Sequence, residues 1–224
     1  MLRILSIAVL VLAIVCPAHA ATRYVDADCT NGISTYNETT QQCTGGASTV
    51  YNSIANGIAA ASSGDVLSLG DDTYTVSNLT LGTGISLTST AADKTKVIIQ
   101  PSANDSVNPF VRLDSETPGT SGNQTISYVT IDGRGTYTAT KGIRIRNRDD
   151  VTIHHCTIEA FYGTQDDYGW GGINGSYGVY VYSTEVTASD EWCDFVATDG
   201  SLDKTGWPTN PVDNFQFYNN TVDD

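Results

Sequence analysis

Basic residues are scarce in this chain. Only 11 lysines and arginines stand against 25 aspartates and glutamates, which gives a formal net charge of −14. So acidic a surface repels nucleic acid and anionic membranes and favours solubility, so neither is an expected partner. Beyond residue 20 no apolar run is long enough to cross a bilayer. The sequence also lacks zinc-ligand spacings, a phosphate-cradling glycine motif and a serine–histidine nucleophile pattern, so we assign no metal, nucleotide or serine-hydrolase site.

Residues 1–20 have the pattern of a secretory signal peptide. Arg3 supplies a basic start, residues 4–16 are almost all apolar, and Ala18 and Ala20 form an A-x-A cleavage site. The apolar run is short compared with the ~20 residues that span a membrane, which favours cleavage over an N-terminal anchor. We therefore expect a secreted protein, whether extracellular, periplasmic or held at the cell surface. Without Arg3, the remaining 10 basic and 25 acidic residues give a net charge of −15.

Two short phrases recur along the chain with their apolar positions in register. The first is QTISYVTI at 124–131, VTIHHCTI at 151–158 and FQFYNNTV at 215–222. The second is FVRLD at 110–114, GIRIR at 142–146 and GVYVY at 178–182, with starts 32 and 36 residues apart. Self-similarity at a period of ~20–50 residues is typical of stacked repeats, in which each unit buries its apolar face only against its neighbours.

The alternation inside these phrases indicates strands with one inward and one outward face. Short strands without intervening helices could also form an antiparallel sandwich. The in-register repetition instead favours a coil in which each strand lies parallel on its counterpart one turn earlier. We expect four inward ladders: Val111, Ile143 and Val179; Leu113, Ile145 and Val181; Ile126, Ile153 and Phe217; Ile131, Ile158 and Val222.

Beside a bend, Val129, Cys156 and Asn220 share a further inward position. A buried Asn220 would need its amide hydrogen-bonded to the backbone or to a neighbouring coil. Cys29 and Cys43 flank a polar loop, and because export permits disulfides we expect these two to pair. Cys193 falls in a long insertion, so Cys156 is expected to remain a small buried apolar residue.

Three regions follow from this organisation: a signal peptide at 1–20, an N-terminal cap at 21–64 and coils at 65–224, with insertions at 159–177 and 183–213. Residues 51–61 carry Ile54 and Ile58 among alanines, which predicts one short helix. A helix there would cover the open end of the stack. The last rung is followed by no closing element, so we expect the chain to be truncated at its C-terminus.

Several segments together point to a known family. They are RYVD at 23–26, YNSI at 51–54 with its alanine-rich helix, GDVLSLGDDTY at 64–74, GIRIRN at 142–147 and FYNNTV at 217–222. They resemble the pectin lyase-like superfamily of right-handed parallel β-helices. The resemblance implies an all-β, right-handed parallel β-helix (solenoid) with one short N-terminal capping helix. It implies less about function, because a fold does not fix its chemistry.

Outward positions of the second phrase predict a polar, partly cationic patch. Its two rows are Arg112, Arg144 and Tyr180, then Asp114, Arg146 and Tyr182. Lys141 and Arg148 lie close by in sequence. Arginines gathered on one face suit the carboxylates or sulfates of an acidic sugar. The alternative is solvated edge charge that balances neighbouring aspartates.

All three tryptophans lie in the insertions that flank the strand at 178–182. We predict that Trp170, Trp192 and Trp207 line the walls of a groove, where aromatic rings stack on sugars. The alternative is that these rings only pack the long loops onto the coil.

The resemblance implies a polysaccharide groove over one parallel sheet. In a lyase of this fold, Arg144 or Lys141 would be the base, and Arg144 and Arg146 would neutralise the uronate. A guanidinium is a poor base at its usual pKa of ~12.5–13.8, so it would need a special site. A hydrolase would use paired carboxylates, for inversion ~6.5–9.5 Å apart. Asp149–Asp150 and Asp166–Asp167 are available, but adjacent aspartates are common turn formers.

The same acidic pairs could hold calcium through oxygen ligands, although no EF-hand pattern supports this. His154 and His155 invite a general base or a metal pair, but a third ligand is missing and exposed bend residues are the simpler interpretation. The leading hypothesis is an exported β-helix protein that binds an acidic polysaccharide and could cleave it, more readily as a lyase than as a hydrolase. The alternative is a non-catalytic surface or adhesion protein. The sequence does not indicate an oligomeric state.

Overall fold

The computed structural model describes residues 20–102, 109–134, 141–161, 177–182, 194–195 and 214–223. Within these residues the protein is built from strands and one short helix. No helix among them has the length and apolar character needed to cross a membrane. The predicted signal peptide, residues 1–20, lies outside the described residues except for Ala20.

Three sheets make up the body. Sheet 1 has the order β17 (Gln216–Tyr218), β13 (Arg148–His154), β10 (Thr120–Ser127), β7 (Ser86–Ser89), β4 (Val66–Leu69), β1 (Thr22–Val25), β3 (Ser48–Tyr51) and β2 (Ile33–Tyr36). Sheet 2 has the order β18 (Thr221–Asp223), β14 (Thr157–Glu159), β11 (Thr130–Asp132), β8 (Val97–Pro101) and β5 (Asp72–Val76). Sheet 3 has the order β16 (Asp194–Phe195), β15 (Tyr177–Tyr182), β12 (Lys141–Arg146), β9 (Val111–Asp114) and β6 (Leu79–Thr80).

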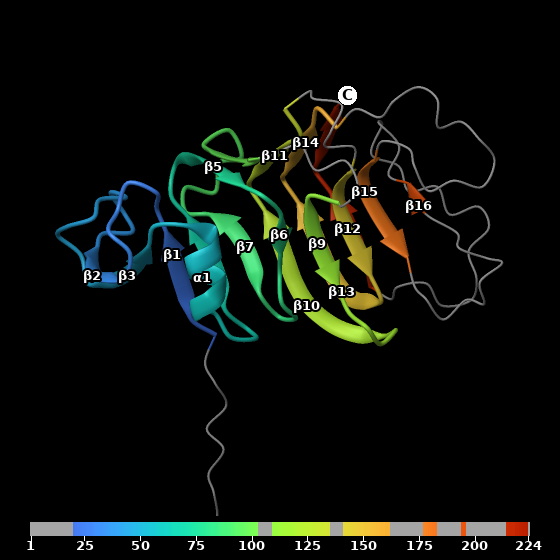
Figure 1. The fold of residues 1–224 in the computed structure, drawn as a ribbon, viewed down its shortest axis with the longest axis horizontal. Helices are drawn as coiled ribbons and strands as arrows, with labels where there is room; N and C mark the ends of the chain where they lie inside the picture. Colours follow the sequence, from blue (N-terminus) through green and yellow to red (C-terminus); the bar gives the residue numbers. More distant parts are fainter. Residues whose placement is uncertain are drawn as a thin grey trace, which may run out of the picture.

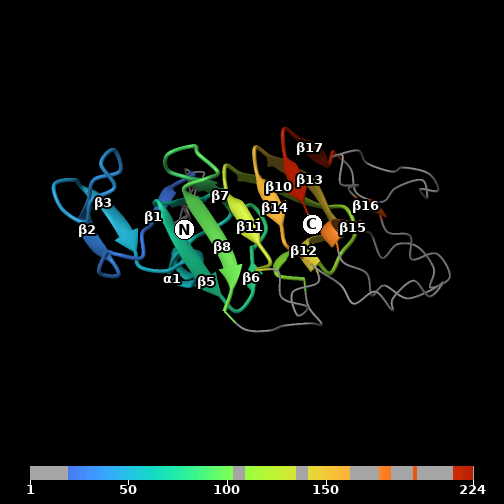
Figure 2. The ribbon, with the colours of Figure 1, turned by 90° about the horizontal axis from the view of Figure 1, so that it is seen from above.

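Each turn of the chain contributes one strand to each sheet. Thus β4, β5 and β6 are followed by β7, β8 and β9, and each new strand pairs in parallel with the one three places earlier. Figure 1 shows β6, β9, β12 and β15 side by side, and Figure 2 shows the matching row of β5, β8, β11 and β14. This is a parallel β-solenoid, which confirms the predicted stack of coils.

The predicted inward ladders are confirmed residue by residue. Ile143 pairs in register with Val111 on one side and with Val179 on the other. The other three ladders pair in the same way, through Ile145, Ile153 and Ile158. The members from the central coils are almost fully buried in one continuous core. Branched aliphatic side chains suit this core because they pack well on a pleated, half-buried surface.

Backbone bends between sheets 1 and 2 occur at one register position in successive coils. Tyr128, His155 and Asn219 each have a positive φ of 54–55°, the left-handed conformation that turns the chain sharply. Immediately after this bend, Val129 and Cys156 are fully buried. Asn220 follows in the next coil, accepts a hydrogen bond from the Cys156 N–H at 2.9 Å and donates one to the Ile153 carbonyl at 2.9 Å. The hydrogen bonds expected for the side-chain amide of this inward asparagine are therefore present.

The helix α1 (Ile54–Ala60) packs on β1, β3 and β4 at the N-terminal end of the solenoid (Figure 1). Ser53 caps it, accepting a hydrogen bond from the Asn56 N–H. Gly57 is buried in this contact and leaves no room for a larger residue, because a Cβ there would lie 2.7 Å from Val25 Cγ2. The expected helix of 51–61 is thus shorter than predicted: Tyr51 is the last residue of β3.

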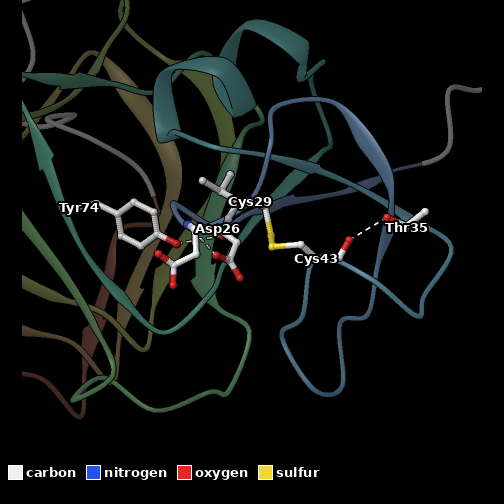
Figure 3. The surroundings of a disulfide bond; sticks show 7 residues. Asp26, Cys29, Thr35, Cys43 and Tyr74 are labelled. Carbon is white, nitrogen blue, oxygen red and sulfur yellow. Dashed lines mark hydrogen bonds between the residues drawn. A yellow bond between two sulfur atoms is a disulfide. The ribbon is translucent and has the colours of Figure 1, made fainter.

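The polar segment before the helix contains a hairpin that the sequence did not reveal. Strands β2 and β3 pair antiparallel and extend sheet 1 beyond β1. Cys29 and Cys43 form the expected disulfide, with their Cα atoms 5.3 Å apart. Figure 3 shows this bond beside Asp26 and the Tyr74 hydroxyl, which donates to the Val25 carbonyl. The disulfide therefore attaches the hairpin region to the first coil.

Candidate binding face

The outer face of sheet 3 carries the predicted patch in the predicted register. Arg144 of β12 pairs with Arg112 of β9 and with Tyr180 of β15, and the next outward row is Asp114, Arg146 and Tyr182. These pairings put the three arginines on neighbouring strands, which lie ~4.8 Å apart in a sheet. The short strand β16 then pairs antiparallel with β15 and places Phe195 beside Tyr180. That strand lies inside the insertion 183–213 and had no signal in the sequence.

Within the patch, Arg144 is engaged by a carboxylate of the preceding coil. Its Nε donates to Asp114 Oδ1 at 2.9 Å and its Nη2 donates to Asp114 Oδ2, which is the parallel two-bond geometry of a strong ion pair. The two side chains are only 20% and 18% exposed. A neighbouring carboxylate favours the charged guanidinium, so this pairing opposes the role of a base that Arg144 would need in a lyase.

The other two arginines are far less engaged within the described residues. The Arg112 Nε donates to the Pro109 carbonyl at 3.3 Å, and no ion pair joins this guanidinium to a described carboxylate. The Arg146 Nε is shielded from solvent and has no hydrogen-bond partner in the described part of the chain. A buried donor without a partner costs about 1–3 kcal/mol.

Arg148, which the sequence placed near this patch, belongs to the interior instead. It is 3% exposed, and its guanidinium donates to the Leu81 carbonyl at 2.9 Å, the Gln124 Oε1 at 2.8 Å and the Asp114 carbonyl. Desolvation by burial lowers its pKa from the usual value, while the nearby Asp114 charge acts in the opposite direction. Arg148 is therefore close to the patch in sequence but is not part of its exposed face.

Several predicted site residues lie outside what the structure describes. Lys141 is the first residue of β12 and pairs with Tyr177, but the side chains of Lys141, Tyr180 and Tyr182 are not among those described. Trp170, Trp192 and Trp207 also lie outside the described residues, as do most of the insertions at 159–177 and 183–213. The walls of the groove therefore stay a prediction.

Asp150, one of the aspartate pair in β13, makes structural contacts. Asp150 accepts hydrogen bonds from the Ser121 hydroxyl and the Asn214 amide, and these two bonds, the first the larger, lower its pKa. These contacts join β13 to β10, its neighbour in sheet 1, and to residue 214, which precedes β17. Asp166–Asp167 lies outside the described residues, and within those that are described no three His, Cys, Asp or Glu side chains gather as metal ligands. The calcium prediction therefore gains no ligand set here.

Strand alternation did not predict a second cluster of side chains, which lies outside sheet 3. His154 and His155 come together with Tyr128 and Tyr218 at the bend between sheets 1 and 2, with the two imidazole Nδ1 atoms 2.8 Å apart. Alternation predicts that adjacent strand residues point to opposite faces, but the positive φ of His155 ends the alternation there. The only sequence signal was the pair of histidines itself.

Comparisons of the chain with protein-family models, curated proteins and solved structures found no match. What is established is the architecture, a parallel β-solenoid with strands stepping in threes and one short helix in the described residues. Such a fold supports many different activities, so function has to be argued from the side chains.

Proposed function

We propose that this protein is an exported β-solenoid that binds an acidic polysaccharide along the outer face of sheet 3. Export is inferred from the signal-peptide pattern of residues 1–20. The finer resemblance to the right-handed pectin lyase-like superfamily, carried by GIRIRN at 142–147 and the N-terminal segments, supports a sugar polymer as the ligand.

The observation that carries this proposal is a pair of guanidinium groups on adjacent strands that form few contacts with the described residues. Arg112 and Arg146 flank the Arg144–Asp114 ion pair, and neither has a carboxylate partner in the described part of the protein. Guanidinium groups bind carboxylates and sulfates through two parallel hydrogen bonds. In a chain with a net charge of −14, a local arginine pair marks one face for anions.

The contacts of Arg144 favour binding over cleavage. A lyase base must give up its proton, whereas the Asp114 carboxylate stabilises the protonated guanidinium. Arg144 acts in this proposal as a positioning residue, because its ion pair with Asp114 links the row that contains Arg112 to the row that contains Arg146. This supports a non-catalytic surface protein over a lyase.

Binding of the full-length chain to polygalacturonate, alginate and heparin, with neutral dextran as the reference polymer, tests the proposal. We expect Arg112→Gln and Arg146→Gln each to weaken binding about tenfold or more, since a hydrogen bond to a charged group contributes about 1.5–3 kcal/mol. Lys96→Gln, which removes one positive charge from an exposed side chain before β8, is the matched control and should bind like the wild type.

Equal binding of dextran, or arginine variants that bind as tightly as Lys96→Gln, would contradict the proposal. The same mixtures should show no rise in the ultraviolet absorbance of an unsaturated uronate. Such a rise would restore the lyase hypothesis, and its loss in a Lys141→Ala or Arg144→Ala variant would identify the base.

A further inference from the structure

The second cluster of side chains carries an inference that is independent of the polysaccharide face. His154 is the last residue of β13 and His155 follows it in the left-handed conformation. This bend brings both rings to the same side of the coil, so that Nδ1 of one imidazole lies 2.8 Å from Nδ1 of the other. One of the two atoms carries the hydrogen that joins them, and the other accepts it.

Aromatic rings from the coils on either side hold this arrangement. Tyr128, from the coil before, stacks on His155 with ring centroids 4.9 Å apart. Tyr218, from the coil after, stacks on His154 with ring centroids 5.1 Å apart and the planes within 7° of parallel. Each imidazole is therefore braced by a ring of another coil, and the pair is preorganised instead of being free to rotate in solvent.

We propose that His154 and His155 form a two-nitrogen chelate for a divalent transition metal of the copper(II) or nickel(II) type. Metal–nitrogen bonds to histidine are about 2.0–2.1 Å long. With the Nδ1 atoms 2.8 Å apart, the angle that they subtend at such an ion is close to 90°. This is the angle between neighbouring ligands in the tetragonal geometry of copper(II) and nickel(II), whereas a tetrahedral zinc site needs its nitrogens farther apart.

Ligation by both histidines needs a lone pair on each of the two Nδ1 atoms. When the ion binds, the hydrogen between the two Nδ1 atoms moves to Nε2 of the same ring, and the ion lies to one side of the line that joins the two nitrogens.

An outer contact is also in place. The Asn219 side-chain amide lies 3.3 Å from the His155 Nε2 atom. An asparagine amide can present either its NH₂ or its oxygen, so after rotation its oxygen can accept from the Nε2–H that metal binding requires. Ligating histidines commonly donate their second N–H in this way, which fixes the ring.

The remaining coordination positions are left to water. Within the described residues no third His, Cys, Asp or Glu side chain completes a metal-binding group. The site is therefore an open, exchangeable one on the surface of the solenoid, and the acidic chain raises the local concentration of cations around it.

Copper(II) titration of the full-length chain, carrying no histidine tag, tests this inference by electron paramagnetic resonance. His19, in the signal peptide, is present in every sample, so a difference between samples reports His154 and His155. We expect the wild type to show coupling to two imidazole nitrogens. His154→Gln and His155→Gln should each lose that pattern and bind at least about tenfold more weakly, a loss at least as large as that from removing an outer-shell partner.

The exposed carboxylate variant Asp28→Asn is the control and should leave the two-nitrogen spectrum unchanged. Circular dichroism of each variant verifies that the solenoid is folded. A wild-type spectrum without nitrogen coupling overturns the inference. It is equally overturned if each single variant keeps half of the binding at unchanged affinity, because two independent imidazoles would behave in that way.

Discussion

Replacing Arg148 by methionine should destabilise the solenoid more than any surface change. The Arg148 side chain reaches from β13 to the Leu81 carbonyl after β6 and to the Asp114 carbonyl at the end of β9. It therefore connects three successive coils through one guanidinium. The Gln124 Oε1 is a further acceptor, and Gln124 in turn donates to the Gly82 and Ile85 carbonyls.

The size of the effect follows from the acceptors that methionine leaves behind. Two backbone carbonyls, one side-chain amide oxygen and the Ser115 hydroxyl would lose the Arg148 donor in a largely buried region, and an orphaned buried group costs about 1–3 kcal/mol. Methionine also removes a desolvated charge, which offsets part of this loss. A net decrease of about 3–5 kcal/mol in the free energy of unfolding is the expected result, a large share of the roughly 5–15 kcal/mol that stabilises a typical protein.

Urea unfolding of the full-length chain, followed by circular dichroism, measures this decrease as a lower midpoint with an unchanged slope. Arg134→Met is the matched control, because the Arg134 guanidinium belongs to an exposed residue and makes one long bond to the Pro101 carbonyl. It should shift the free energy by about 0.5 kcal/mol or less. If Arg148→Met unfolds at the same urea concentration as Arg134→Met, the reasoning from buried acceptors is refuted.

Three further outcomes are expected. Asn220→Ala, which deletes both amide bonds to the preceding coil, should lower the free energy of unfolding by about 2 kcal/mol in the same urea assay, and an unchanged midpoint would contradict this. Replacing Cys29 and Cys43 together by alanine opens a loop with a sequence separation of 14 and should cost about 3 kcal/mol under oxidising conditions; a double variant as stable as the wild type would argue against it. Burial raises the pKa of Cys156 to about 11, so in a background with Cys16→Ser and Cys193→Ser its thiol should resist alkylation at neutral pH until urea unfolds the chain, and rapid labelling of the native protein would be inconsistent with the structure.

The register in which the strands pair was predictable from the sequence, because the alternation within each strand and the recurrence of the phrases along the chain agreed. GIRIR and GVYVY alternate with a period of two, and their recurrence along the chain fixes which strand lies on which. A shift of one residue would expose Ile143 and Ile145 and bury their arginine neighbours, so only one pairing was physically acceptable. The same alternation predicts the outward rows that contain Arg112, Arg144 and Arg146.

The contacts made by these side chains were not predictable in the same way. Alternation describes a straight strand, but Asn147 and His155 have positive φ and stand where the chain turns from one sheet to the next. Beyond such a residue the inward and outward positions are reset, so Arg148 is buried and both histidines emerge together. The hairpin of β2 and β3 was hidden for another reason, since its residues are largely polar and the Cys29–Cys43 disulfide supplies part of its stability.

The left-handed bend has an evolutionary consequence. A residue with a Cβ at positive φ stores roughly 1–3 kcal/mol of backbone strain, and glycine would relieve it at 128, 155 or 219. A library selected for heat resistance alone should therefore fill this corner with glycine and erase the row of tyrosine, imidazole and amide groups. At these three positions, the residue that would most stabilise the backbone is therefore not the residue that carries a polar or aromatic side chain.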